Sequence, residues 1–225
     1  NITIAGLYTH YASAESDAPL SRTQCTSFHQ VLTKLKAAGR SFEYIHMNNS
    51  AGLLHEQKSN HNLARPGLLV YGVMPTGPRR SPAIMKRHIR PALSWKCRVS
   101  LVKSIAKETK LSYGQTYTAK RTMRVATLTA GYGDGYHYSA QREARVLIGE
   151  RLCPILGHIT MDQMIVDVSR VKTAKTGDEV VLIGKQGKHN ITANQLAKWA
   201  NTIPCEILTA IAYRVPRVYR GGQAA

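Results

Sequence analysis

The sequence is poor in phenylalanine, in acidic residues and in closely spaced metal or disulfide ligands. Its 225 residues include two Phe, and its four cysteines lie far apart without a C-x-x-C pair. Its nine histidines are dispersed and no H-E-x-x-H motif occurs, so a metal site is not indicated. The cysteines instead predict buried or free thiols in a reducing compartment. They are Cys25, Cys97, Cys153 and Cys205.

Long hydrophobic runs are also missing. No apolar run approaches the roughly 18 residues that a membrane-spanning helix requires, and no signal-peptide pattern opens the chain. We therefore expect a soluble, cytoplasmic protein. The chain begins at Asn1 directly in the apolar segment Ile2 to Tyr8, which favours a start of the gene product upstream of Asn1.

The charge balance is strongly basic. Thirty-one Lys and Arg against thirteen Asp and Glu give a formal net charge of +18. Such a charge suits nucleic acid, an anionic membrane surface or phosphorylated ligands. However, the basic residues form only short pairs such as Arg79-Arg80 and Lys86-Arg87, which favours a solvated basic surface over a nucleic-acid site.

The first part of the chain alternates strand-like and helix-like segments. Apolar residues recur at i, i+3, i+4 and i+7 from Phe28 to Leu35, and Gly39 ends this predicted helix. The pattern is typical of an α/β unit with parallel strands. Its predicted strands are Ile2–Tyr8, Glu43–Met47 and Leu68–Tyr71.

From about Ala92 short alternating runs separated by Gly, Pro and Asp turns replace this pattern. One helix interrupts them, because Thr192 and Gln195 form a capping-box pattern. The Pro-rich, basic stretch from Pro75 to Pro91 is the predicted linker. The predicted strands are Trp95–Val102, Arg124–Ala130, Arg145–Ile148, Met164–Val168 and Glu179–Ile183.

Seven short segments are carried in an order that is typical of one enzyme family. Each alone is a weak signal, but seven in order are strong, and together they resemble alanine racemase, the pyridoxal-phosphate enzyme of bacterial cell-wall synthesis. The resemblance runs from end to end of the chain. The segments are GLYTHYASAESD (6–17), NNSAGLL (48–54), ARPGLLVYG (64–72), LSYGQTYTA (111–119), AGYGDGY (130–136), GHITMDQM (157–164) and AYRVPRVY (212–219).

The resemblance implies an α/β plus β fold. Residues 1–88 would form the back part of a (β/α)8 barrel on the cofactor-phosphate side, and residues 89–225 a mostly β domain that carries the catalytic tyrosine. The implied activity is interconversion of L- and D-alanine by two-base proton transfer on a pyridoxal-phosphate aldimine, for cell-wall precursor supply. The family's segment with the cofactor-binding lysine has no counterpart in this sequence, so this chain alone is not expected to racemise by the family's route.

The resemblance assigns catalytic roles to Tyr113, Arg65 and His10. The chain has eleven Tyr against two Phe, and a phenol, unlike a benzene ring, can move a proton. A phenol titrates near pH 10, so neighbouring cations are needed for it to act as a base at neutral pH. Arg65 matches the arginine that faces the pyridine nitrogen, where a guanidinium cannot readily give up a proton. His10 matches a histidine between the arginine and the tyrosine.

Further residues match cofactor and substrate positions of the family. Ser50, Gly67, Leu68 and Tyr213 match groups around the cofactor phosphate, which backbone N–H groups and hydroxyls bind. Tyr132 matches a tyrosine that narrows the substrate channel, Met161 a backbone contact to the substrate carboxylate, and Asp162 follows it in the same channel. In the family this site is shared between the subunits of a homodimer, so Tyr113 is expected to act in the partner's barrel.

Two other interpretations remain open at the sequence level. The first is a truncated, non-catalytic relative that binds RNA or an anionic complex, motivated by the net charge and the missing lysine. It gains weight if Asn1 is close to the natural start. The second is a racemase for another amino acid, such as serine, which uses the same machinery in a pocket of different shape.

Overall fold

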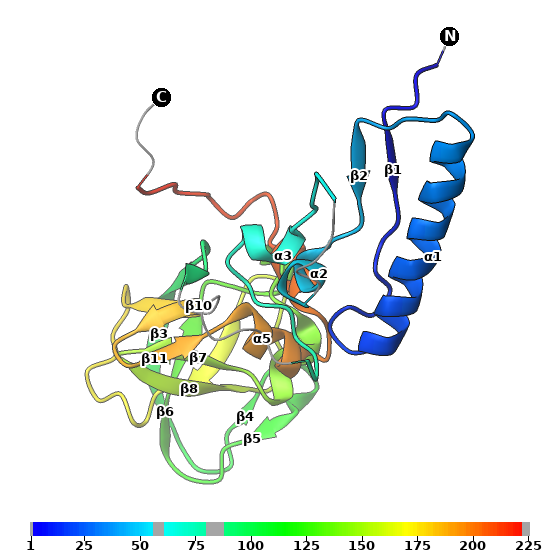
Figure 1. Cartoon of the computed structure of the whole chain (residues 1–225). Helices are drawn as coiled ribbons and strands as arrows, with labels where there is room; N and C mark the ends of the chain where they lie inside the picture. Colours follow the sequence, from blue (N-terminus) through cyan, green and yellow to red (C-terminus); the bar gives the residue numbers. More distant parts are fainter. Residues whose placement is uncertain (1, 56–60, 80–87, 222–225) are drawn as a thin grey trace. The chain divides into compact units, whose positions relative to one another are not determined.

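The computed structural model describes residues 2–55, 61–79 and 88–221, and divides into two compact units, Asn1–Ala92 and Leu93–Ala225 (Figure 1). We call them unit 1 and unit 2 and describe each by itself. The sequence predicts a domain boundary between residues 88 and 89, and that position stays a prediction. None of the described helices is long and apolar enough to cross a membrane.

Unit 1 is a β-α-β arrangement followed by two short helices. Parallel strands pair Gly6 with Tyr44 and Tyr8 with His46, so the predicted parallel α/β unit is confirmed. Between the strands, Asp17 caps the long helix by accepting a hydrogen bond from the Leu20 amide at 2.8 Å. The elements are β1 (Gly6–Tyr8), α1 (Ala18–Ala37), β2 (Tyr44–His46), α2 (Ser50–His55) and α3 (Gly67–Val70).

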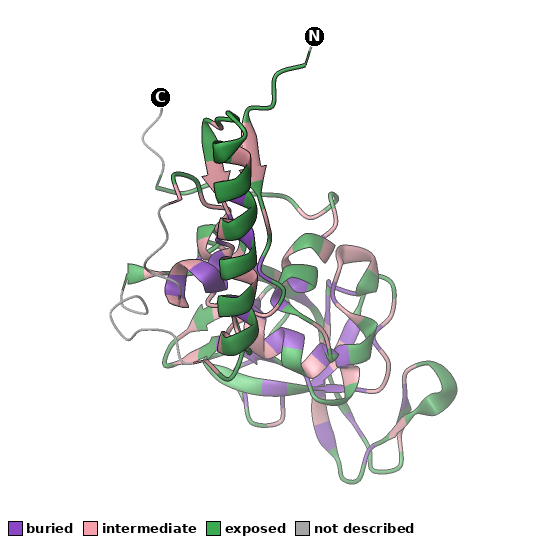
Figure 2. Cartoon of the chain, turned by 45° about the vertical axis from the view of Figure 1, so that its right-hand side comes forward, coloured by how far each residue is buried: buried purple, intermediate pink, exposed green. Residues whose placement is uncertain are grey.

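The long helix α1 buries only a narrow stripe. Ser21, Phe28 and Leu32 are buried, and the remaining faces are largely exposed along its length (Figure 2). Phe28 joins a small cluster with Tyr11, Ala14, Met47 and Ala51. This cluster fixes the chain just after β1 and β2, where the candidate site of unit 1 lies.

Unit 2 is a closed antiparallel barrel. Its sheet has the order β11-β10-β3-β6-β9-β8-β7, and an additional pairing of β10 with β7 closes it. The predicted alternation is seen in β9, where Met164 and Val166 are buried and Ile165 and Asp167 are half-buried, whereas β7 and β10 bury consecutive residues such as Leu147 and Val181 with their neighbours. The strands are β3 (Trp95–Ile105), β6 (Met123–Leu128), β7 (Arg145–Ile148), β8 (Arg151–Leu156), β9 (Met164–Asp167), β10 (Glu179–Gln186) and β11 (His189–Ile191).

Short elements decorate the barrel. The predicted helix is α5 (Ala193–Ala200), and the Thr192 hydroxyl accepts from the Gln195 amide at 3.1 Å, which confirms the cap. A second helix follows, α6 (Pro204–Ala210), together with the two-stranded hairpin β4 (Lys110–Leu111) and β5 (Tyr117–Thr118). Three 3₁₀ turns carry site residues: η1 (Tyr113–Gln115), η2 (Tyr132–Asp134) and η3 (Tyr138–Arg142).

Several predictions of elements were wrong. The run Leu68–Tyr71 lies in helix α3 and the turn after it, because Pro66 precedes it and the Leu69 amide bonds back to the Pro66 carbonyl at 2.8 Å. The predicted strand from Ile2 is paired only from Gly6. Strand β8, the β4-β5 hairpin and α6 were missed, since each is too short or too irregular to give a clear period. Part of the predicted linker, residues 80–87, lies outside the described residues.

Candidate active site

In unit 1 the guanidinium of Arg65 is the centre of a polar cluster. One terminal nitrogen, Nη2, lies 2.9 Å from His10 Nδ1 and 3.1 Å from the Thr9 carbonyl oxygen. The other, Nη1, bonds to His46 Nδ1. The loop before α3 therefore brings Arg65 to the carboxyl ends of both strands, β1 and β2. His10 and Arg65, predicted to be neighbours, are in contact.

These contacts determine the role of Nδ1 in each imidazole. A guanidinium only donates, so His10 Nδ1 and His46 Nδ1 must each accept and cannot carry a hydrogen. Burial, followed by the positive charge of Arg65, lowers the pKa of His46 below its ordinary value. The cluster thus keeps a permanent cation beside the His46 ring.

Aromatic rings support this cation from one side. The Arg65 guanidinium carbon lies 5.1 Å from the centre of the Tyr8 ring, within range of a cation–π interaction. The Tyr8 ring in turn stacks on His46, with 5.2 Å between centroids and 4° between planes. Tyr8 and His46 therefore both contact the Arg65 guanidinium at the ends of the strands.

A second group of contacts surrounds the hydroxyl of Ser50. It donates to the Pro66 carbonyl oxygen and accepts from the Leu69 amide at 3.2 Å. Ser50 is buried, and Gly67 adopts a positive φ of 30° directly beside it. A methyl group on Gly67 would lie 3.7 Å from the Ser50 oxygen, so this concave turn is lined by the hydroxyl and by backbone.

The start of α3 adds hydrogen-bond donors to the same turn. The first amides of a helix have no carbonyl partner within that helix, so those of Gly67 and Leu68 are available for an acceptor outside it. A hydroxyl with clustered amides is a donor set that suits phosphate. Ser50, Gly67 and Leu68, predicted as a group, do lie together.

Asn49 joins the two groups. Its side-chain oxygen accepts from the Gly52 amide at 2.8 Å and so caps α2, while its Nδ2 lies 3.4 Å from His10 Nε2. Because Asn49 directly precedes Ser50, the cap that starts α2 also sets the distance between the Ser50 turn and the Arg65 cluster. No sequence motif had indicated Asn49, His46 or Tyr8 as site residues.

In unit 2 the predicted site residues are exposed. The exposed fractions are 75% for Tyr113, 46% for Tyr132, 53% for Met161 and 101% for Tyr213. Tyr113 begins η1, in the connection between β4 and β5, and follows Ser112, whose φ is +68°.

Two loops of unit 2 are joined by their backbones. The Tyr132 amide donates to the Thr160 carbonyl at 3.0 Å, and the Gly133 amide donates to the Met161 carbonyl at 2.8 Å. A methyl group on Gly131 would lie 2.2 Å from the Thr160 oxygen, so only glycine permits this approach. Tyr132 and Met161 are therefore brought together as predicted.

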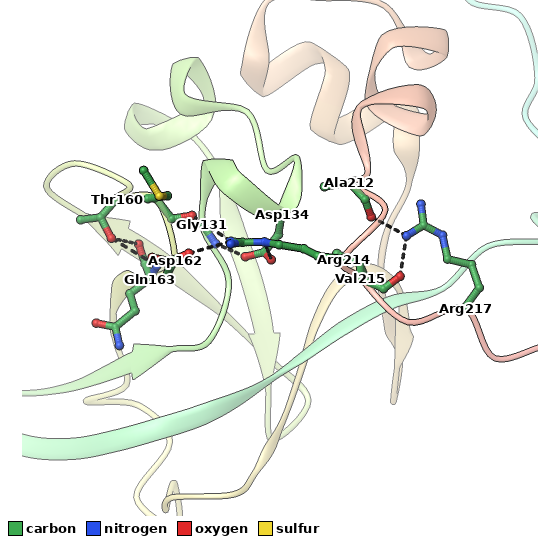
Figure 3. Close-up of polar contacts among 10 residues, drawn as sticks. Gly131, Asp134, Thr160, Asp162, Gln163, Ala212, Arg214, Val215 and Arg217 are labelled. Atoms are coloured by element: carbon green, nitrogen blue, oxygen red, sulfur yellow. Dashed lines mark hydrogen bonds and ion pairs between the residues drawn. The ribbon is translucent and has the colours of Figure 1, made fainter.

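Arg214 clamps these loops (Figure 3). Its Nε donates to Asp134 Oδ1 at 2.8 Å and its Nη2 to Asp162 Oδ1 at 2.7 Å. These hydrogen bonds, that of Asp134 first, raise the pKa of Arg214 above its ordinary value. Asp134 uses its other oxygen to accept from the Gly131 amide at 2.9 Å. Asp162, predicted as a channel residue, is thus an ion-pair partner of Arg214.

Neither Arg214 nor Asp134 had been singled out as a site residue. They are 80 positions apart and carry no spacing that marks them as a pair. Tyr213, which precedes Arg214, is fully exposed. Among the residues that the structure describes, no group of His, Cys, Asp and Glu gathers as a metal site.

Both halves of the chain match models of one family. The model described as "Alanine racemase, N-terminal domain" covers residues 1–75, and "Alanine racemase, C-terminal domain" covers residues 92–219. An alanine racemase of Symbiobacterium thermophilum is 42% identical over 100% of this chain and 59% of its own length.

Solved structures agree with this assignment. The alanine racemase of Streptomyces coelicolor A3(2) gives a TM-score of 0.90 at 32% identity, over 97% of this chain and 56% of its own. That of Bacillus anthracis with bound L-Ala-P gives 0.87 at 32%, over 98% and 56%. The predicted fold class, part of a (β/α)8 barrel followed by a mostly β domain, is confirmed. The chain spans somewhat more than half the length of the relatives that it matches.

Proposed function

Because this chain belongs to the alanine racemase family, we propose that it is the portion of a pyridoxal-phosphate-dependent racemase that binds the cofactor phosphate and ring and supplies one of two proton-transferring groups. The substrate is alanine, and the product D-alanine serves cell-wall synthesis. The observation that carries the proposal is the double contact of Arg65 with His10 and His46, next to the Ser50 turn.

The residues of unit 1 fit pyridoxal phosphate. The Gly67 and Leu68 amides would hold the phosphate, the Ser50 hydroxyl would donate to it in place of the Pro66 carbonyl, and Arg65 would face the pyridine nitrogen. When bound, the cofactor supplies an electron sink for a carbanion at the substrate α-carbon. Arg65 cannot deliver a proton to the ring nitrogen, because a guanidinium stays protonated and its neighbours, His10 and His46, are held as acceptors. The site thereby limits the sink and disfavours transamination.

Unit 2 contributes the residues that face the substrate. The Tyr113 phenol moves a proton at the α-carbon from one side, and the family's lysine, which this sequence does not contain, acts from the other. Tyr132 and the Met161 amide orient the substrate, and Arg214 holds their loops against one another. The exposure of Tyr113 supports a site completed by a second subunit in a homodimer.

A cytoplasmic location belongs to the same proposal. All four cysteines are free thiols, and Cys205 is exposed. An exposed free thiol is typical of a reducing compartment. The substrate and the cell-wall precursor route implied by the resemblance fit the same compartment.

The test uses the complete gene product with Tyr113→Phe. We expect the wild type to interconvert both alanine enantiomers, and the variant to lose about 10²–10⁴-fold in kcat, since it lacks the general acid-base group. Chiral chromatography of product measures both directions. Tyr219→Phe is the matched control, because Tyr219 is 91% exposed in the same unit.

Three outcomes would contradict the proposal. If the complete protein shows no visible absorbance band that disappears on reduction with borohydride, a bound aldehyde cofactor is excluded. RNA retention that weakens steeply with salt, without racemisation, would favour the basic binding protein instead. Faster turnover of serine than of alanine would move the assignment to another substrate.

A further inference from the structure

The residue before Tyr113 is held in a conformation that is costly for anything but glycine. Ser112 has φ 68° and ψ 171°. Its hydroxyl donates to the His158 carbonyl at 3.0 Å and accepts from the His158 amide at 2.9 Å. A methyl group on Gly157 would lie 2.6 Å from Ser112 Cβ, so the two segments touch. The backbone on either side of His158 therefore fixes the start of the Tyr113 turn.

The side chain of His158 leads away from this contact. Its Nδ1 lies 2.8 Å from Gln141 Oε1, which also accepts from the Ile159 amide at 3.3 Å. Since the Ile159 amide only donates, the Gln141 oxygen faces both groups and His158 Nδ1 carries the hydrogen. The His158 imidazole is thus oriented by Gln141 of η3, whose side-chain oxygen is held in turn by the Ile159 amide.

Tyr138 connects His158 to Tyr132, the tyrosine proposed to orient the substrate. The Tyr138 ring stacks on His158, with 5.5 Å between centroids and 20° between planes, and its hydroxyl oxygen is a second acceptor for the hydrogen on Nδ1, at 3.0 Å. The Tyr138 ring also contacts the Tyr132 ring edge-on, with 6.3 Å between centroids and 74° between planes. Both geometries are favourable ring arrangements.

We propose that Ser112, His158 and Tyr138 are positioning residues that couple the Tyr113 turn to the Tyr132 loop. Tyr113 and Tyr132 are both largely exposed, so core packing does not set their directions. The continuous path of hydrogen bonds and ring contacts sets them instead. A displacement at one tyrosine is transmitted to the other, and a substrate gripped at Tyr132 is thereby aligned with the Tyr113 phenol. The purpose of this coupling rests on the proposed function, but its existence does not.

The coupling is tested on the chain itself by ¹⁹F resonances of incorporated 3-fluorotyrosine. Ser112→Ala removes both bonds to His158 and should shift the Tyr132 resonance. Tyr138→Leu removes the ring bridge and should shift that of Tyr113. His189→Ala, a half-buried histidine on β11, is the control and should shift neither. Unchanged resonances of the distant tyrosine in both variants would overturn the proposal.

Kinetics of the complete protein provide the functional arm. Tyr138→Leu should lower kcat/KM by about 10–100-fold through misplacement of the substrate, whereas Tyr138→Phe, which keeps the ring, should recover most of it. Equal losses in both variants would contradict a role of the ring contacts. If the wild type does not racemise at all, the proposed function fails, and the resonance shifts still decide the coupling.

Discussion

The two units of the chain complete their sheets differently. In unit 2, β10 pairs with β7 and the barrel closes around buried residues such as Leu147, Val181 and Ile191. In unit 1, as far as it is described, β1 and β2 pair only with one another, and Tyr8, Tyr44 and Val70 stay exposed.

The two units accordingly position their site residues by different kinds of contact. Unit 2 presents its residues on loops of a closed scaffold, where backbone bonds and Arg214 fix them. Unit 1 has a small core, and its site depends on the polar contacts of Arg65, Asn49 and Ser50. Loss of a polar contact should therefore disturb the site of unit 1 more than that of unit 2, whose loops stay attached to a closed barrel.

Core truncation should give the largest effect. Leu147→Ala removes a fully buried side chain from the barrel and should cost about 2–5 kcal/mol of unfolding free energy. Leu32→Ala in α1 should destabilise unit 1 alone. Denaturant unfolding followed by amide hydrogen exchange in each unit measures both. Equal destabilisation of both units by either variant would refute independent cores.

Acid and alkali should act on different units. His46 has a lowered pKa in the folded chain, so the unfolded chain takes up more protons and unit 1 loses stability as the pH falls below about 6.5. Burial raises the pKa of Cys97 and of Cys153 to about 12, so unit 2 is stable below the ordinary thiol value and loses stability as the pH rises above it. Unit-resolved hydrogen exchange from pH 5 to 10 checks both directions, after correction for the intrinsic exchange rate. His46→Gln should flatten the acid limb.

The Arg214 clamp should contribute little to stability. Its side chain is 47% exposed, so Arg214→Gln should leave the free energy of unfolding nearly unchanged, but it should raise KM in the complete protein by releasing the Met161 loop. Lys96→Gln is the control, because its 2.8 Å ion pair with Glu179 is similarly exposed and lies on the barrel strands. An equal rise in KM in both variants would show that the ion pairs of Arg214 do not position the site residues.

The sequence indicated much of the fold where a pattern is local. Alternation located the long strands, and Thr192 with Gln195 located α5. Local pattern failed at Leu68–Tyr71, where four apolar residues fit a strand or a buried helix equally well. The ordered motifs identified the family and grouped Arg65 with His10 and Ser50 with Gly67. No motif indicated that His46 is the second partner of Arg65 or that His158 contacts Ser112.

By itself the sequence determined the family, the mostly β character of unit 2, and the residue types that can move a proton or bind a phosphate. Those properties follow from side-chain chemistry and short-range periodicity. Only the tertiary structure decided that Arg214 joins Asp134 and Asp162, and that His158 lies between Ser112 and Tyr138. Such contacts join residues tens of positions apart, and their partners are set by the path of the chain through the barrel.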